Sequence, residues 1–281
     1  MAASGVLYVV ATPIGNLGDI SRRAVEILGS VDLVAAEDTR VTGRLLAYIG
    51  VKTRMVSYRD ENERRLSPRL VRSLQAGQSI ALVSDAGTPC ISDPGYRLVR
   101  AAAEAGIEVV TLPGPSAAIA LLAVAGLPTD RFAFEGFLPP AGGARRKLLE
   151  SMRSSGRTTV VYESPRRIVR LLEELADVLD DPPVAVGREL TKLHEEVLRG
   201  KASEIAGVLA DRGPRGEFVV AVYAAGAPAV LDGEALRAEV ERLLAQGSSV
   251  RDAAERLKER GVSRRAVYEA ARSVKLEDEN V

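Results

Sequence analysis

Three short segments rich in Gly, Pro and small polar residues have the composition of a ligand site. They are Thr12–Asp19 (TPIGNLGD), Ser84–Gly95 (SDAGTPCISDPG) and Pro113–Ala117 (PGPSA). Each follows an apolar run that is typical of a buried strand. Gly lets the backbone approach a ligand closely, and Asp85 and Ser116 supply hydrogen-bonding groups. One such segment indicates only a tight turn, whereas three of them after three strands favour a binding site.

The first segment stands where a dinucleotide-binding loop would, but it lacks the glycine spacing of that loop. Gly15 and Gly18 are three residues apart, so the G-x-G-x-x-G pattern is absent. That pattern holds a pyrophosphate at a helix N-terminus. The loop is therefore not expected to bind a dinucleotide.

Charged residues follow three further apolar runs. They are Glu37, Asp38 and Arg40 in AAEDTR, Glu163 in VVYESPRR and Arg188 in VGRELTK. Capping of the next helix explains Asp38, but it does not explain Glu37 or Glu163. For the Arg188 group the alternative is a solvated charged turn.

The composition is that of an ordinary globular protein and excludes several classes of site. Of 281 residues 46% are hydrophobic and 27% charged, and no run is long enough for a membrane span. One cysteine, Cys90, can form no internal disulfide, which predicts a cytoplasmic protein. With a single histidine, His194, no metal site is expected.

The net charge of zero conceals basic clusters. Residues 40–72 hold nine Lys and Arg against three acids, residues 142–170 eight against two, and residues 251–275 eight against four. Such clusters indicate local contacts with anions, or alternatively solvated helix faces.

Strands and helices alternate along the first 112 residues. Strands are predicted at 5–11, 31–36, 79–84 and 107–112, and helices at 21–28, 39–49, 60–75 and 94–105. In the last of these helices Asp93 is predicted as the N-cap and Pro94 as the first residue. The alternation predicts a mainly parallel sheet, with the three loops at the carboxyl ends of its strands.

A second alternating block follows the PGPSA hinge. A short apolar helix extends to about residue 125, and then strands are predicted at 131–137, 158–162 and 184–189, with helices at 144–154 and 165–178. Two late strands, in EEVLRG and GEFVVAVYA, flank a helix at 202–210. The fold class is therefore α/β, with lobes at 1–113 and 114–225.

A linker-like segment at 224–233 precedes a helical unit at 233–281. Helices are predicted at 234–246, 249–260 and 263–274, with a turn at Gly261. The last two resemble a helix-turn-helix, in which Arg264 and Arg265 could contact RNA. The alternative is that these helices form a small bundle with a structural role only.

Seven ordered motifs resemble the tetrapyrrole methylase superfamily, and within it the ribosomal RNA small subunit methyltransferase I branch. They are TPIGNLGDIS, AEDTR, SDAGTPCISDPG, PGPSA, EGFLP, YESPRR and GRELTK, across residues 5–225. Corrin- and porphyrin-building relatives usually carry G-G-D-P where this chain has Ser84–Gly87. That departure is typical of the ribosomal branch.

The resemblance implies S-adenosylmethionine in a cleft between the two lobes, and a homodimer. By similarity the residues expected around the cofactor are Pro13, Ser84, Asp85, Ala86, Gly87, Ile91, Ser116, Ala117, Tyr162, Val186 and Val219. This donor has no phosphate, which agrees with the missing glycine pattern of the first loop.

The ribosomal branch methylates the 2′-hydroxyl of a cytidine in the decoding region of 16S rRNA, in the small ribosomal subunit. A carboxylate is the natural base for that hydroxyl, and the candidates are Glu163, Glu37, Asp38 and Asp85, with the first two preferred. Arg40, Arg166 and Arg188 are expected to hold phosphates.

Two other functions are compatible with parts of the sequence. One is C-methylation of a tetrapyrrole, whose acidic macrocycle would also suit basic patches. The other is a non-enzymatic regulator that senses a ligand and binds DNA through the C-terminal helices. The number of cleft motifs favours the enzyme over the regulator.

Overall fold

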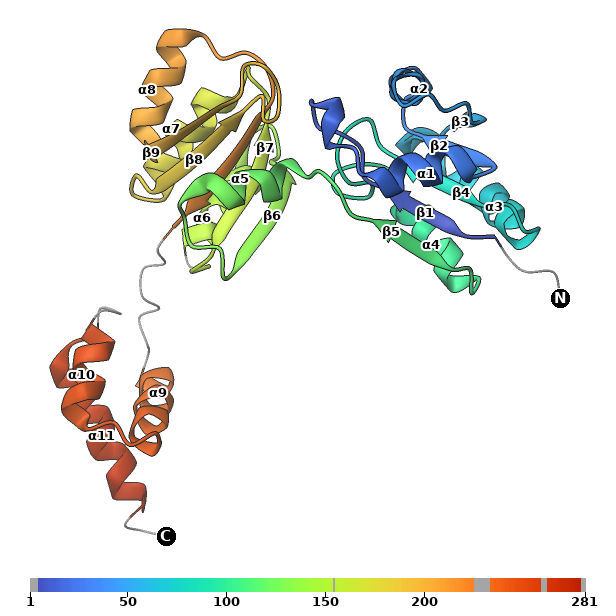
Figure 1. The fold of residues 1–281 in the computed structure, drawn as a ribbon. Coiled ribbons are helices and arrows are strands. Elements are labelled where there is room, and N and C mark those ends of the chain that lie inside the picture. Colours follow the sequence, from blue (N-terminus) through green and yellow to red (C-terminus); the bar gives the residue numbers. More distant parts are fainter. Residues whose placement is uncertain (1–4, 154, 225–232, 259–261, 279–281) are drawn as a thin grey trace.

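Two α/β lobes and a unit of three helices follow one another along the chain (Figure 1). The structure is a computed structural model that describes residues 5–153, 155–224, 233–258 and 262–278. No helix among these residues is both long and apolar enough to cross a membrane.

The first lobe is a five-stranded sheet in which every pair is parallel. Its strands lie in the order β3-β2-β4-β1-β5. Their bounds are β1 Leu7–Val10, β2 Leu33–Ala36, β3 Met55–Ser57, β4 Ile80–Val83 and β5 Val109–Leu112. The predicted parallel sheet is thus confirmed, with the addition of the short edge strand β3.

Helices cover both faces of this sheet, because successive strand residues point to opposite sides. The helices are α1 Arg22–Ser30, α2 Thr39–Tyr48, α3 Asp60–Gln75 and α4 Tyr96–Glu104, and a 3-10 turn, η1, spans Leu17–Asp19. Leu7 and Leu82 pack with Leu74 of α3 and Leu98 of α4. The opposite face buries the side chains of α1 and α2 against a separate set of strand residues.

Helix α4 begins later than the sequence predicts. Its N-cap is Gly95, at a φ of 138°, and its first residue is Tyr96. The prediction that Asp93 caps this helix was therefore wrong, and its carboxylate is left for another role.

The second lobe contains a mixed sheet in the order β6-β7-β10-β8-β9. Its strands are β6 Phe132–Phe137, β7 Thr158–Glu163, β8 Pro183–Arg188, β9 Glu196–Lys201 and β10 Phe218–Tyr223. Only β6 and β7 pair in parallel, while β10 runs antiparallel to both its neighbours and β9 to β8.

Helices α6 Gly143–Arg153, α7 Ile168–Val178 and α8 Ala202–Arg212 share one core with this sheet. Helix α5 Ala117–Ala125 packs on the other face, where Leu121 and Leu122 are buried. Because α5 begins directly after the Pro-Gly hinge, its first turn lies where the two lobes meet.

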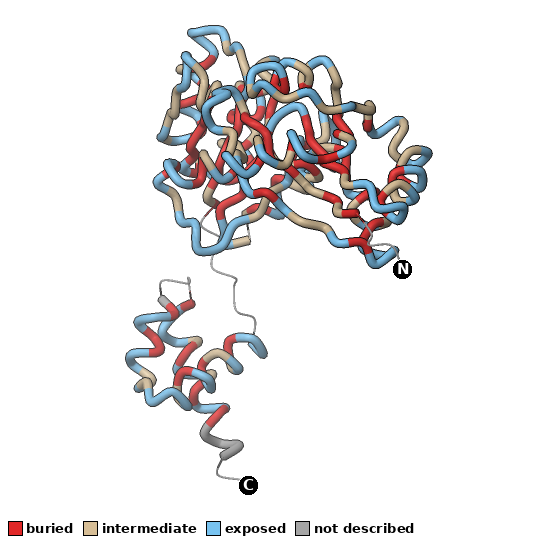
Figure 2. The backbone as a smooth tube through the Cα atoms, turned by 45° about the vertical axis from the view of Figure 1, so that its right-hand side comes forward, coloured by how far each residue is buried: buried red, intermediate tan, exposed pale blue. Residues whose placement is uncertain are grey.

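The three C-terminal helices have a core of their own (Figure 2). They are α9 Gly233–Ala245, α10 Val250–Lys258 and α11 Arg264–Asp278, close to the predicted ranges. Val240, Ala253 and Val267 are fully buried among them. Residues 225–232 of the predicted linker, and the turn predicted at Gly261, lie outside the described residues.

Candidate functional site

A cleft of about 430 Å³ lies between the two α/β lobes. The first lobe lines it with Ile14, Ala86, Gly87, Thr88, Ile91, Ser92 and Asp93, and the hinge with Ser116 and Ala117. The second lobe contributes Phe137, Tyr162, Glu163, Ser164, Pro165, Gly187, Leu190, Gly216, Glu217, Phe218 and Val219. All three loops singled out by composition therefore reach one site.

Backbone hydrogen bonds join two of these loops at the floor of the cleft. The N–H of Thr12 donates to the carbonyl of Gly87 at 2.8 Å, and the N–H of Gly87 donates back at 3.0 Å. The Thr12 hydroxyl adds a bond to the carbonyl of Ser84 at 3.1 Å. Gly87 has a φ of 82°, and a Cβ there would lie 3.4 Å from Ile14. A glycine suits this position because its backbone is left-handed and the space above it belongs to the cleft.

Direct contacts tie the lobes together at the rim of the cleft. The N–H of Asn16 donates to the hydroxyl of Thr191 at 3.1 Å. A Cβ on Gly15 would overlap the side chain of Lys192, at 2.4 Å. Likewise a Cβ on Gly136 would lie 2.8 Å from the Ser92 hydroxyl. Both glycines thus permit close approach between the lobes.

An aromatic cluster forms the second-lobe wall. The ring centroid of Tyr162 lies 5.0 Å from that of Phe134 and 5.6 Å from that of Phe137, both edge to face. Burial raises the pKa of the Tyr162 phenol. A flat, partly apolar wall of this kind suits a heteroaromatic ring.

The charged residues of the cleft lining are all acidic. Its carboxylates are those of Asp93, Glu163 and Glu217, and no Lys or Arg is among the residues that line it. Glu163 and Glu217 are paired with basic side chains outside the lining, so among the described residues Asp93 is the carboxylate left to attract a cationic ligand. The lining fits S-adenosylmethionine, whose sulfonium and ammonium groups are cations and whose adenine is a flat ring.

Most residues predicted around the cofactor line this cleft, namely Ala86, Gly87, Ile91, Ser116, Ala117, Tyr162 and Val219. Pro13, Ser84 and Asp85 instead line a neighbouring hollow of about 240 Å³ beside α2. Val186 is buried within β8, next to Gly187 of the cleft wall.

Asp85 belongs to a compact polar cluster with the AEDTR residues. Its carboxylate accepts the N–H of Asp38 at 2.9 Å, and its own N–H donates to the Glu37 carboxylate at 3.1 Å. These residues surround a polar hollow of about 190 Å³ together with Arg40 and Arg59. The side chain of Asp85 is thus engaged away from the large cleft.

Two carboxylates of this cluster differ in basicity. Burial raises the pKa of Glu37, the hydrogen bond from the Asp85 N–H offsets part of this increase, and the charges of Asp85 and Asp60 raise the pKa further. The Arg40 side chain, hydrogen-bonded to Asp38, holds the pKa of that carboxyl far below its usual range. Asp38 also caps α2, since it accepts the N–H of Arg40 at 2.8 Å. Of the two, Glu37 is therefore the better proton acceptor.

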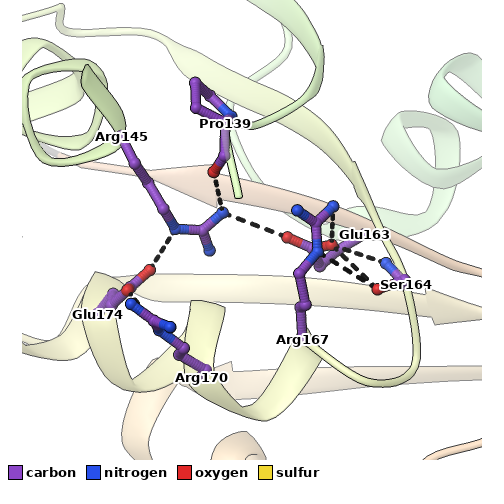
Figure 3. A network of polar contacts seen from close by, with 7 residues as sticks. All are labelled: Pro139, Arg145, Glu163, Ser164, Arg167, Arg170 and Glu174. Atoms are coloured by element: carbon purple, nitrogen blue, oxygen red, sulfur yellow. Dashed lines mark hydrogen bonds and ion pairs between the residues drawn. The ribbon is translucent and has the colours of Figure 1, made fainter. Parts of the chain in front are cut away.

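Glu163, which was predicted as a base, lies at the centre of a buried ion-pair network (Figure 3). One carboxylate oxygen accepts the N–H of Ser164 at 2.8 Å and lies 2.7 Å from Nη2 of Arg167. The other lies 3.4 Å from Nη1 of Arg145. Both oxygens are thus occupied at the edge of the cleft.

Arg145 extends this network to the neighbouring helix. Its Nε atom donates to Glu174 of α7, and its Nη1 atom donates to the carbonyl of Pro139 at 3.0 Å. Its Nη2 atom is buried without a hydrogen-bond partner among the described residues. The network fixes the orientation of the β7 carboxyl end, where the cleft wall forms.

The arginines predicted to bind RNA lie in different settings. Arg40 pairs with Asp38, and Arg188 lies 3.6 Å from Glu196. Arg166 is exposed beside the cleft residue Pro165. In the helical unit Arg264 pairs with Glu255 and Arg265 with Glu269.

The sequence reasoning missed Asp93 as a site residue. It lines the cleft, and burial raises its pKa to about 6. Its motif, SDPG, was interpreted as the start of a helix with Asp93 as the cap, so no role in the site was assigned to it.

Comparison with known proteins places the chain in a family. Residues 6–206 match the family described as Tetrapyrrole (Corrin/Porphyrin) Methylases. A relative from Synechocystis sp., named Ribosomal RNA small subunit methyltransferase I, is 46% identical over 94% of this chain and 96% of its own length. A relative of the same name from Escherichia coli O157:H7 is 50% identical over 78% of each chain.

The solved structure of uroporphyrin-III-C-methyltransferase from Thermus thermophilus superposes with a TM-score of 0.55. It covers 82% of this chain and 98% of its own, and at 22% identity the likeness shows the fold alone. The chain therefore belongs to the tetrapyrrole methylases and, within them, to the ribosomal RNA small subunit methyltransferase I family.

Proposed function

We propose that this chain transfers a methyl group to the 2′-hydroxyl of a cytidine in the decoding region of 16S rRNA. The observation that carries the proposal is the near full-length similarity to relatives named for a small-subunit rRNA methyltransferase. The chain is a methyltransferase, and its methyl donor is S-adenosylmethionine.

The cleft between the lobes is proposed as the donor site. Its volume of about 430 Å³, its aromatic wall and its carboxylates suit a flat ring joined to a sulfonium amino acid. Small residues at Ala86, Gly87 and Ala117 leave the backbone open to hydrogen bonding. The sulfonium supplies an activated methyl group, so positioning by these residues accounts for much of the rate.

The acceptor strand is proposed to approach from the rim, where Arg40, Arg166 and Arg188 would contact phosphates. A sugar hydroxyl inside an RNA chain reaches an enclosed site more easily when its nucleotide is splayed out. The helical unit 233–281 is proposed to add RNA contacts through Arg264 and Arg265. The enzyme is proposed to act in the cytoplasm as a homodimer.

Tetrapyrrole C-methylation is less well supported by the cleft. An acidic macrocycle would need basic partners, whereas the cleft lining contains carboxylates and no Lys or Arg. A DNA-binding regulator would not need a methyl donor.

One assay separates these functions. The enzyme is incubated with labelled methyl donor and either small ribosomal subunits that lack the modification or uroporphyrinogen. Label is expected in the rRNA alone, at a linkage that resists alkaline cleavage because its 2′-oxygen is blocked. Label in the macrocycle, or on a base of the RNA, would overturn the proposal.

A further inference from the structure

Only one of the three carboxylates in the cleft lining lacks a basic partner among the described residues. Glu163 is paired with Arg167 and Arg145. Glu217 lies 3.0 Å from Nζ of Lys192, and its side chain is 80% exposed. Asp93 has no ion pair in the described part of the chain, although it is partly buried in the same cleft.

The loop that carries Asp93 is held in place from both lobes. Cys90 and Ser92 have left-handed backbones, with φ values of 72° and 62°. A Cβ on Gly95 would lie 2.8 Å from both the Cys90 sulfur and the side chain of Leu82 in β4. On the other side, the hydroxyl of Ser92 packs directly over Gly136 of β6. Such a loop keeps its unusual conformation because packing on both flanks determines it.

The surroundings of Asp93 favour a proton acceptor. Burial raises its pKa to about 6, a hydrogen bond from the Ser84 hydroxyl lowers it, and the charges of Glu37, Asp85 and Asp60 raise it further. Across the cleft its charge acts on the phenol of Tyr162, and within its own loop on the thiol of Cys90. A general base works best when its pKa lies near the working pH.

We propose, in an inference that rests on the proposed function, that Asp93 takes the proton of the RNA 2′-hydroxyl during methyl transfer. The hydroxyl oxygen forms a bond to the methyl carbon while the bond from that carbon to sulfur breaks. The electron pair of the broken bond stays on sulfur, which becomes a neutral thioether. The hydroxyl proton passes to the Asp93 carboxylate and then to water, so the carboxylate is regenerated.

The variant Asp93→Asn tests this role, because it keeps the shape of the side chain but cannot accept the proton. Single-turnover methylation of saturated small subunits is expected to slow by about 10²–10⁴-fold even at saturating S-adenosylmethionine, so that weaker donor binding cannot account for the loss. In the wild type the rate should rise with pH to a plateau above about pH 6, and the variant should lose this step. Asp211→Asn, an exposed residue of α8, is the control and should match the wild type.

A measurement without catalysis tests the same carboxyl group. Unfolded Asp ionises near pH 4, whereas Asp93 in the folded protein ionises near pH 6. The contribution of Asp93 to wild-type stability therefore falls as pH rises between these values, because the unfolded state releases its proton first. The melting temperature of Asp93→Asn relative to the wild type should rise from pH 4 to pH 6 and then stay constant.

The two measurements separate this proposal from the proposed function. If the wild type methylates a base instead of the ribose, the proposed function fails, and the melting curves still report on Asp93. A rate loss below about tenfold in Asp93→Asn would fall short of general-base catalysis and overturn the role. A melting difference that does not change between pH 4 and pH 6 would also overturn it.

Discussion

Arg145 Nη1 and Glu163 Oε2 lie 3.4 Å apart, and their side chains are only 2% and 0% exposed. Breaking this pair is expected to be costly, because Oε2 of Glu163 would stay buried without a partner while only Oε1 keeps its contact with Arg167. The pair joins α6 to the carboxyl end of β7, where the second-lobe wall of the cleft begins.

Replacing Arg145 should therefore destabilise the second lobe strongly. We expect Arg145→Met to lower the free energy of unfolding by about 3–5 kcal/mol, as for other broken buried pairs. Urea denaturation measures this loss. The double variant Arg145→Met with Glu163→Gln should recover part of it, since it removes the charge of a carboxylate whose Oε2 atom has lost its partner. Arg146→Met, whose side chain is exposed on the same helix, is the control. A loss no larger than that of the control would contradict the importance of the pair.

Glu163→Gln separates the two roles that the sequence and the structure suggest for this residue. As a base, Glu163 would lose about 10²–10⁴-fold in methyl transfer on this change. As a structural partner of two arginines, it would lose stability instead, with less than about tenfold change in rate. We expect the structural outcome, because both carboxylate oxygens already accept bonds. Single-turnover rates at saturating donor, measured beside urea denaturation, distinguish the two results.

Much of the fold could be predicted because its signals are local. Apolar runs mark β1 and β4, and the helix predicted at residues 60–75 is α3, Asp60–Gln75. The edge strand β3 was missed, because its three residues are all half-buried and show no alternation.

The site was harder to predict, because it depends on where side chains point. The sequence shows Asp85 in a ligand loop, but its carboxylate accepts a backbone N–H of a different loop. The sequence suggests that Asp93 caps helix α4, but in the structure the cap is Gly95. Arg145 stands in a run of basic residues that suggests a solvated face, yet it is buried. Each of these outcomes depends on partners that are distant in the sequence.

Gly87→Ala tests whether the floor of the cleft belongs to the donor site. A side chain at a φ of 82° costs about 1–2 kcal/mol in backbone strain, and its Cβ would stand against Ile14 at the cleft. We expect lower stability together with weaker binding of S-adenosylmethionine in calorimetry. Gly106→Ala is the matched control, because its φ is 69° and nothing lies within 4 Å of the added Cβ. It should lose similar stability and keep its donor affinity. Equal donor affinity in both variants would place the donor elsewhere.

Removal of the C-terminal helices should uncouple RNA binding from donor binding. The buried residues of α9, α10 and α11 form one core, so a chain ending at Ala224 should retain both lobes and the cleft. We expect its donor affinity to match that of the full chain and its methylation of small subunits to fall.

Binding of a phosphate by Lys or Arg releases counterions, so removing the arginines of this unit should also flatten the dependence of RNA affinity on salt. The logarithmic slope should become shallower by about 0.7–0.9 for each phosphate that the shortened chain no longer binds. Filter binding across a salt series measures this slope. An unchanged slope together with an unchanged methylation rate would mean that these helices serve packing and not RNA binding.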